Sequence, residues 1–475
     1  MLVRPFHPDI MEGAMRPPMS LGYLARALQE AAIEYDVVDM HLGHGEKHLN
    51  RRIEAFKPDL IGFTMISMGY GHVYGLIRNL RRKFSVPVVA GGPHVSALGA
   101  RVLEECPEIE FGVYGEGEAT LTELCRNRRI DTIQGLVHRS GGGIRVNPPR
   151  PLETDLDSIA FPTYERFELD RYASRGISII TTRGCPYACI FCSSHLTAGK
   201  KFRGKSIAKV GEEIDYWYRQ GRRNFIIEDD NFTYVRARVL EFGEEVERRN
   251  LKDVEWTISG VRADKIDDEV LGSLKRIGVK KIAFGVESAS DKVLRALRKS
   301  ERIQTIEKSI ARACESGFDV ILYFLVGSPD ETWDDLMESV RLALRYPLFD
   351  VYFFNLYPTP GTALFSMAEE NGWMLEPPAL YLNSVNPRGK NPVFATPQMD
   401  RGQRKKALRF TKKVRRTVRK RYFEKKLAGW GVLSKLFASV FLMDSIQPLL
   451  KKRKGVRSVV VFFYNLFKKD GERYV

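Results

Sequence analysis

Three cysteines at CxxxCxxC spacing have the clearest chemistry in this sequence. Cys185, Cys189 and Cys192 follow directly on the β-branched run Ile177–Thr182, so they leave the end of a predicted strand on a tight loop. Thiolates are the ligands of iron–sulfur clusters, and a cubane cluster takes four of them. One loop with three thiolates would therefore leave one iron open to a further molecule.

The other three cysteines do not suggest a disulfide framework. Cys106 and Cys125 lie in helical patterns, and so does Cys314. Cys314 is the only later cysteine that could complete a zinc site with the loop, and its helical context favours a core position instead. With no charged and apolar leader after Met1, this cysteine usage predicts a reducing, cytoplasmic compartment.

The cysteine loop opens a series of strand-like runs with helical patterns between them. The runs begin near residues 177, 225, 254, 280, 319 and 351. An eight-unit β/α barrel uses roughly 31 residues per unit, so six units predict a partial (β/α)6 barrel. We expect this domain to cover residues 171–375, with its site at the strand C-termini.

Polar groups follow the predicted barrel strands. Glu228, Asp229 and Asp230 follow the second strand, Arg262 follows the third, and Gly285–Ser288 end the fourth. An acidic triplet after an apolar run is expensive to bury unless it meets a cation or an ammonium group. A cluster of helix N-caps is the alternative interpretation of the triplet.

A second α/β pattern precedes the barrel, over residues 1–145. Strand-like runs fall at 2–6, 35–39, 60–64, 86–90 and 111–114, with amphipathic helices at 20–33, 46–56, 70–84, 96–105 and 118–127. Apolar strands alternating with helices predict a doubly wound, Rossmann-like parallel sheet. Ligands of such sheets bind beyond the strand C-termini.

Glycine-rich stretches stand at three of these strand ends. They are Gly62–Ser67, Gly91–His94 and Gly115–Glu118. Glycines there allow close approach of the backbone to a ligand, although each could also be ordinary strand-to-helix punctuation. No GxGxxG or GxxxxGK[ST] pattern occurs at these points, which argues against a dinucleotide or ATP.

Three histidines between two of these elements form a weaker candidate. His44 and His48 are four residues apart, a spacing that would suit zinc on a helix, and His41 is close by. Because no carboxylate or cysteine stands at ligand spacing, we expect solvated histidines on a loop and a helix start.

A connector joins the two α/β domains. A β-hairpin is expected around Ser140–Gly143, and the prolines that follow predict an extended linker over residues 146–170.

The net charge of +16 resides in the last domain, residues 376–475. Residues 401–475 hold 23 Lys and Arg against 4 Asp and Glu, leaving 52 basic and 55 acidic residues before them. We expect a basic amphipathic helix over 401–426, followed by apolar segments at 427–446 and 458–467. Peripheral membrane contact, a helical cap on the barrel and RNA binding all remain open. The tail has no recognisable RNA-binding module, which counts against nucleic acid.

Taken together, these motifs resemble a known enzyme family. The barrel resembles a radical SAM domain of the cobalamin-associated branch in Cys185–Cys192, Glu228–Asn231, Arg262, Gly285–Ser288 and Pro358–Gly361. The first domain resembles the cobalamin-binding domain found ahead of many radical SAM domains in Pro18–Ala25, Pro58–Gly62, Val89–His94 and Gly115–Glu118. The DxHxxG signature of other cobalamin proteins is missing, since Asp39–His44 has His where Gly is required.

For the barrel, the resemblance implies the following roles. Cys185, Cys189 and Cys192 hold a 4Fe-4S cluster, and S-adenosylmethionine chelates its open iron. Phe191 packs by the adenine, and one of Glu228, Asp229 and Asp230 receives the methionine ammonium. Arg262 faces the methionine carboxylate and Glu287 the ribose hydroxyls, with Ser288 as a further cofactor contact.

For the first domain, the resemblance implies a corrinoid that lies across the strand ends. The implied cobalamin contacts are Gly91, Gly92, His94, Gly115 and Glu116.

The function this implies is cleavage of S-adenosylmethionine to a 5′-deoxyadenosyl radical, followed by cobalamin-dependent C-methylation of an apolar or lipid-like substrate. An external electron donor such as flavodoxin or ferredoxin would supply the reducing electron. A ring-forming or oxidative radical SAM enzyme is one alternative. A non-catalytic cofactor sensor or an RNA-binding protein is another.

Overall fold

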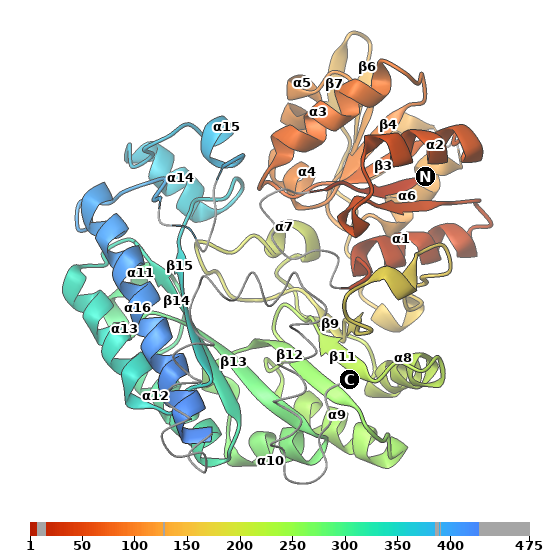
Figure 1. Ribbon diagram of the computed structural model, residues 1–475. Helices are drawn as coiled ribbons and strands as arrows, with labels where there is room; N and C mark the ends of the chain where they lie inside the picture. Colours follow the sequence, from red (N-terminus) through yellow and green to blue (C-terminus); the bar gives the residue numbers. More distant parts are fainter. Residues whose placement is uncertain (7–15, 127–128, 385–388, 390, 427–475) are drawn as a thin grey trace.

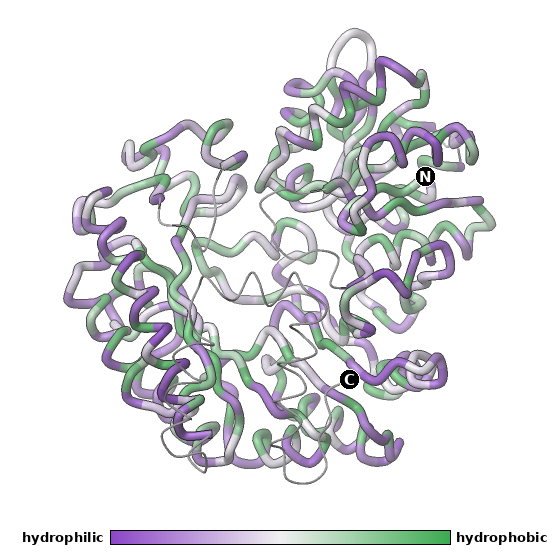
Figure 2. The backbone as a smooth tube through the Cα atoms, in the orientation of Figure 1, coloured by the Kyte–Doolittle hydropathy of each residue, from purple (hydrophilic) through white to green (hydrophobic). Residues whose placement is uncertain are grey.

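Two sheets of mainly parallel strands organise the molecule, with helices around each (Figure 1). The structure, a computed structural model, describes residues 1–6, 16–126, 129–384, 389 and 391–426. Figure 2 shows hydrophobic residues concentrated in the strands and hydrophilic residues along the surrounding helices. The α/β fold class expected from the alternating patterns is confirmed.

The first sheet has seven strands in the order β2-β1-β3-β4-β5-β6-β7. Its parallel strands are β1 (Leu2–Arg4), β2 (Val37–Asp39), β3 (Ile61–Thr64), β4 (Val88–Gly91) and β5 (Phe111–Val113). The expected hairpin, β6 (Leu136–Ser140) and β7 (Gly143–Val146), adds antiparallel to the β5 edge. The helices are α1 (Met19–Glu30), α2 (Glu46–Phe56), α3 (Tyr70–Arg81), α4 (Pro93–Leu98), α5 (Ala100–Glu105) and α6 (Glu118–Cys125).

One expected helix is divided in two. The sequence predicted a single helix over 96–105, whereas α4 ends and α5 begins on either side of Gly99, whose φ is +55°. A left-handed residue cannot continue an α-helix, so the chain turns at this point.

The second sheet is the expected partial barrel, with six parallel strands in the order β15-β14-β13-β12-β11-β8. They are β8 (Ile177–Ile179), β11 (Asn224–Ile227), β12 (Glu255–Val261), β13 (Val279–Glu287), β14 (Asp319–Val326) and β15 (Asp350–Asn355). The helices of this part are α7 (His195–Ala198), α8 (Ile207–Arg219), α9 (Arg236–Arg249), α10 (Asp268–Arg276), α11 (Asp291–Ala296), α12 (Ile303–Glu315) and α13 (Trp333–Arg345).

The run Ile177–Thr182 does not form one strand. After β8 the chain turns into a short ladder, in which β9 (Thr182–Arg183) pairs antiparallel with β10 (Arg203–Gly204). The cysteine loop lies between these two strands, so the ladder closes the base of the loop.

Local sequence signals set the boundaries of several barrel helices. Asp267 caps α10 by accepting a hydrogen bond from the Val270 backbone N–H, at 2.9 Å. Thr332 and Asp335 form a reciprocal capping box at the start of α13. Such caps satisfy backbone donors that have no partner within the helix.

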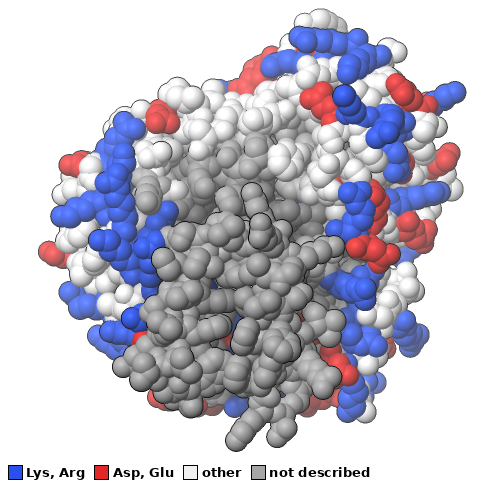
Figure 3. Space-filling model, in the orientation of Figure 1, with Lys and Arg blue, Asp and Glu red and all other residues white. Residues whose placement is uncertain are grey.

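The tail helix α16 (Arg401–Lys426) packs on the barrel. It contacts β14, β15 and α13, and it buries Leu408, Val414 and Val418. Lys and Arg gather on the surface over this helix (Figure 3). The helix thus caps the barrel edge, and its apolar face is covered by protein. The segment before α16 contains α14 (Ala363–Glu370) and α15 (Pro378–Tyr381). This segment contacts the first domain, where Gly69 N donates a hydrogen bond to Leu382 O at 2.6 Å.

No helix among the described residues is long and apolar enough to span a membrane. The apolar segments expected at 427–446 and 458–467 lie outside the described residues. The membrane contact predicted for residues 401–475 therefore stays a prediction.

Candidate functional site

The cysteine loop is held at its base and at its middle. Gly184 N, just before Cys185, donates to Asp230 Oδ2 at 3.1 Å. In the middle of the loop the buried Ile190 donates its N–H to Leu297 O and accepts at its own carbonyl from Leu364 N. The loop is therefore fixed by barrel segments that are far away in the sequence.

The three thiols suit a cluster better than a single ion. Cys185, Cys189 and Cys192 are all partly buried. Within the described part of the chain, their sulfur atoms do not form a group within 4.8 Å of one another, as donors to one zinc ion would. Cys314 packs against the core from α12. Soft thiolate donors on one partly buried loop fit an iron–sulfur cluster with one iron left open.

The acidic triplet divides into different roles. Asp229 is buried and accepts hydrogen bonds from Thr181 N, Thr182 N and Thr181 Oγ1 at 2.7, 3.1 and 2.5 Å. It thereby holds the turn that leads into the cysteine loop. Asp230 binds Gly184 N, and Glu228 pairs with Arg16 at 2.7 Å. Glu228 and Asp230 also line a cavity between the first sheet and the cysteine loop, which is described below, so they are better placed than Asp229 to meet a ligand.

Asn231 is a candidate to which the sequence alone assigned no role. Its side chain is 1% exposed, and Nδ2 lies 3.8 Å from Cys185 Sγ. Its Oδ1 has no hydrogen-bond partner within the described chain. An orphaned buried acceptor beside a cluster ligand fits a donor brought by a cofactor, such as an ammonium group. Its place directly after the acidic triplet was the available signal.

The predicted carboxylate partner Arg262 is already engaged. Its guanidinium donates to Asp264, to Lys299 O and to Ser300 O at 3.0–3.2 Å, and the Tyr187 ring covers it at 3.6 Å. The contact between Arg262 and S-adenosylmethionine remains a prediction, and these bonds leave the guanidinium little capacity for it.

Lys299 is a second basic group at the same place. It is 8% exposed, and its Nζ lies 3.2 Å from Glu287 Oε1 and 3.5 Å from Glu301 Oε2. Burial opposes its charge, but these two carboxylates outweigh burial and raise the pKa of Lys299. The Lys299 ammonium therefore stays charged near Cys189, the middle cysteine of the loop.

Glu287 stands in a strained conformation at the end of β13. Its φ is +64°, in the region that favours glycine, and the register between β13 and β14 shifts at this residue. Strain of this kind is typical of functional positions. Ser288 is fully buried, with its Oγ accepting from Ser290 N at 3.2 Å. Phe191 packs against the core that includes the first sheet.

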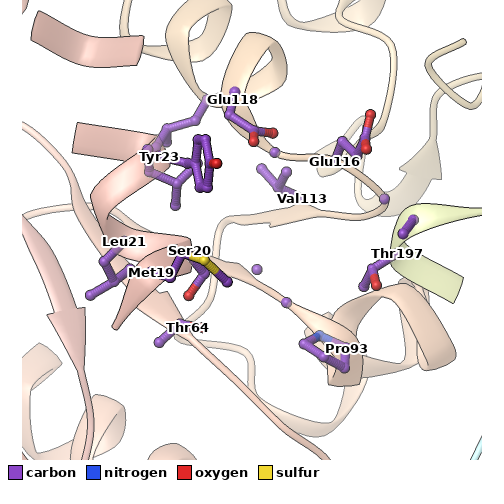
Figure 4. A pocket seen from close by; sticks show the side chains of 18 of the residues that line it. Met19, Ser20, Leu21, Tyr23, Thr64, Pro93, Val113, Glu116, Glu118 and Thr197 are labelled. Atoms are coloured by element: carbon purple, nitrogen blue, oxygen red, sulfur yellow. The ribbon is translucent and has the colours of Figure 1, made fainter. Parts of the chain in front are cut away.

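A cavity of about 460 Å³ lies between the first sheet and the cysteine loop (Figure 4). Its lining comes from the C-terminal ends of β3, β4 and β5, from the start of α1, and from the turn after β8. Thr197 reaches it from α7, within the cysteine loop, on the same side of the cavity as Glu116 (Figure 4). The cavity is thus shared between the two predicted cofactor domains.

Four of the five predicted cobalamin residues line this cavity. These four are Gly91, Gly92, Gly115 and Glu116. A Cβ on Gly92, whose φ is +102°, would stand 2.7 Å from Met65 O, so the close backbone approach there requires glycine. The cavity itself, with a largely apolar wall at the carboxyl ends of parallel strands, is where a sheet of this kind binds its ligand.

His94, the fifth, lies outside that lining. It is fully buried, with Nδ1 3.2 Å from Ser67 Oγ and Nε2 3.2 Å from Tyr74 OH. Burial lowers the pKa of His94 to about 4, so the ring is neutral. Both ring nitrogens are used within the protein, and its predicted contact with cobalamin would need one of these bonds to break.

Of the three candidate histidines His41, His44 and His48, which were expected to be solvated, His41 and His44 are buried. Glu168 of the linker supplies the missing carboxylate, and a ligand atom of each of His44, His48 and Glu168 lies within 4.8 Å of the others. Arg171 Nη1 lies 2.9 Å from His44 Nε2 and 2.7 Å from Glu168 Oε2. The cation at this cluster is therefore the guanidinium.

The fold and the site together define a class: a radical SAM barrel preceded by a corrinoid-type sheet. The family profile of the radical SAM superfamily matches residues 179–343, and that of the B12 binding domain matches residues 14–125. An uncharacterised methyltransferase of Pyrococcus horikoshii is 31% identical over 411 residues, which cover 84% of this chain and 88% of that relative. The chain belongs to the radical SAM enzymes that carry a B12-binding domain. Its cofactors are a 4Fe-4S cluster, S-adenosylmethionine and cobalamin.

Further relatives and solved structures are similar over most of the chain. An anaerobic magnesium-protoporphyrin IX monomethyl ester cyclase of Cereibacter sphaeroides is 28% identical over 386 residues, covering 76% of this chain and 62% of the cyclase. The radical S-adenosylmethionine methyltransferase TsrM of Kitasatospora setae aligns with a TM-score of 0.68 at 22% identity, covering 78% of this chain and 75% of TsrM. The cobalamin-dependent enzyme OxsB aligns with a TM-score of 0.73 at 16% identity, covering 98% and 75%.

Proposed function

We propose that this enzyme transfers a methyl group to an unactivated carbon of a small molecule with an apolar portion. The observation that carries the proposal is the shared cavity, whose walls come from the corrinoid-type strand ends and from the cysteine-loop side. Two relatives that share the architecture, from Pyrococcus horikoshii and Kitasatospora setae, are named as methyltransferases.

Named groups of this chain would hold each cofactor. Cys185, Cys189 and Cys192 would bind the cluster, and the β3–β5 strand ends would bind cobalamin. When bound, these groups supply radical formation from S-adenosylmethionine and a transferable methyl group. The protein's part is to bind, to orient and to exclude water.

The polar groups around the cysteine loop would bind S-adenosylmethionine. The orphaned Oδ1 of Asn231 and the carboxylates of Glu228 and Asp230 would accept from its ammonium group. The Lys299 ammonium would face its carboxylate, a role that the sequence assigned to Arg262. Glu287, held by Lys299 Nζ, would accept from the ribose hydroxyls.

An aromatic surface supports an apolar substrate. Along β14 the buried Leu322 and Phe324 belong to the core formed with the surrounding helices, so the partly exposed Tyr323 between them lies on the other, inner face of the barrel sheet. Tyr323 lies 5.6 Å from the rings of both Tyr352 and Phe354 of β15. Partly exposed rings inside a barrel favour contact with an apolar group. The substrate would lie against this wall, below the shared cavity.

The test is anaerobic reconstitution with iron, sulfide, hydroxocobalamin and S-adenosylmethionine labelled at the methyl group, with reduced flavodoxin as the electron donor. We expect 5′-deoxyadenosine, labelled methylcobalamin and a labelled product from a candidate substrate pool. Release of 5′-deoxyadenosine with no labelled methylcobalamin would favour a ring-forming or oxidative reaction instead. Cleavage that survives Cys189→Ala would contradict cluster chemistry at this loop.

A further inference from the structure

A buried ion cluster joins the cysteine loop to the β5–α6 loop of the first sheet. Arg203 of β10 and Arg183 of β9 are direct partners in the short antiparallel ladder. Both guanidinium groups reach Glu116, the residue between Gly115 and Gly117. Arg183 also donates to Glu118 Oε1 at 2.7 Å.

Arg203 is the hub of this cluster. Its two terminal nitrogens donate to the two oxygens of Glu116 at 3.1 and 2.8 Å, which is a two-pronged contact. The same nitrogens also donate to Glu153 O, in the linker, and to Ala198 O, at the end of α7, at 2.6 and 2.8 Å. One side chain therefore ties together the first sheet, the linker and the cysteine loop.

Burial makes these contacts hard to replace. The Arg203 side chain is 1% exposed and that of Glu116 15% exposed. Removing one partner of a buried pair leaves the other charge without compensation. A lysine keeps the charge but has no planar fork, so it cannot reproduce a contact with both carboxylate oxygens and two carbonyls.

The cluster lies between the two cofactor sites. Glu116, Glu118 and Arg183 line the shared cavity, whereas Arg203 stands behind them and does not. Arg183 is two residues before Cys185, and Arg203 bonds both Glu116 and the carbonyl of Ala198, the residue after Thr197. Any movement at this cluster would shift the cavity wall relative to the cysteine loop.

We propose that Arg203, acting through Glu116 and Arg183, is a positioning residue that sets the distance between the corrinoid and the cluster. The proposal rests on the proposed function in one respect, namely that cobalamin occupies the shared cavity. Misplacement of reacting groups by about 1 Å can slow a reaction by about 100-fold, so a fixed separation is worth a dedicated contact.

The first test needs no cobalamin. Hydrogen exchange is compared in cluster-loaded wild-type protein, R203K and E116Q, with R236K as the matched control, since Arg236 pairs with Asp267 and Glu269 at the surface. We expect exchange to rise about tenfold in both loops, 115–118 and 184–199, in R203K and in E116Q, with no further rise in the double variant. No rise, or a rise only beside the substituted residue, would overturn the proposal.

The second test reads the separation itself. In wild-type protein loaded with cob(II)alamin and a reduced cluster, the magnetic interaction between the two paramagnets gives one defined splitting in the electron paramagnetic resonance spectrum. We expect R203K to broaden or weaken that splitting and R236K to leave it unchanged. An identical splitting in R203K would contradict a positioning role. Wild-type protein that retains no cobalamin would refute the proposed function and, with it, the claim that Arg203 sets the distance between corrinoid and cluster. The exchange result would still decide whether Arg203 couples the two loops.

Discussion

Gly184, the residue before the first cluster cysteine, provides a sharp test of how the loop is built. Its φ is +84°, and a Cβ at this position would stand 2.3 Å from Lys201 O and 3.0 Å from Ala198 O. We predict that Gly184→Ala destabilises the protein and reduces its iron and sulfide content. Both effects have a physical cause in the β9–β10 ladder, which brings the end of the loop back over its beginning.

The expected magnitude has two parts. A left-handed conformation costs an ordinary L-residue about 1–2 kcal/mol. The remainder is steric, because ordinary contacts of a Cβ begin at 3.4 Å, so the loop must open by about 1 Å at Lys201. Both neighbours are backbone carbonyls and cannot rotate away. We therefore expect a total loss of about 3 kcal/mol or more in the free energy of unfolding.

Gly221 separates the two parts. Its φ is +80°, yet a Cβ there would meet nothing within 4 Å. Gly221→Ala should cost only the conformational part, about 1–2 kcal/mol, and should keep a full cluster. The assay is urea denaturation of both variants, with iron and sulfide measured after anaerobic reconstitution. The reasoning would be refuted if Gly184→Ala lost no more stability than Gly221→Ala and retained the same iron content.

Three further predictions concern other parts of the barrel. Burial raises the pKa of Asp335, but bonds from three side chains outweigh it and hold the pKa at about 2. The ionised Asp335 carboxylate therefore stabilises the folded protein fully above pH 3.8, and this contribution is lost as the pH falls through about 2. In urea denaturation, Asp335→Asn should lower the free energy of unfolding by about 1–2 kcal/mol at pH 7 and by much less at pH 2. Lys299→Met should raise the KM for S-adenosylmethionine about tenfold, with Lys299→Arg intermediate, and an unchanged KM would exclude a binding role. Val414 of α16 is buried and its neighbour Lys413 is exposed. In thermal unfolding, Val414→Ala should lower stability by about 1–2 kcal/mol and Lys413→Ala should change it little. Equal effects would mean that α16 does not pack on the barrel.

Much of the fold could be predicted from the periodicity of the apolar residues and from the glycines and prolines between the elements. Five apolar runs with helices between them and six more beyond the linker predicted two parallel sheets, because a buried parallel strand must be apolar on both faces. The boundaries moved where backbone geometry overrode the pattern. The helix expected over 96–105 broke at Gly99, and the strand after Ile179 turned because Asp229 takes up the backbone N–H groups of Thr181 and Thr182.

The candidate site divides in the same way. The spacing of Cys185, Cys189 and Cys192 alone indicated a cluster with an open iron, because ligand type and loop length are local properties of the chain. The roles of the three residues of the acidic triplet, in contrast, depend on partners that are far away in the sequence. Asp229 serves the backbone, Asp230 holds Gly184, and Glu228 remains at the cavity with Arg16.

By itself, the sequence therefore determined the classes of element, their order and the residue types that follow each strand. Only the tertiary structure decided which of those residues are already satisfied by neighbours and which still face a cavity. Arg262 already donates to residues up to 38 positions away, and Arg203 joins Glu116 across 87 positions. Such partners are chosen by the packing of distant segments and by the need to satisfy buried charge, and neither leaves a signal in local spacing.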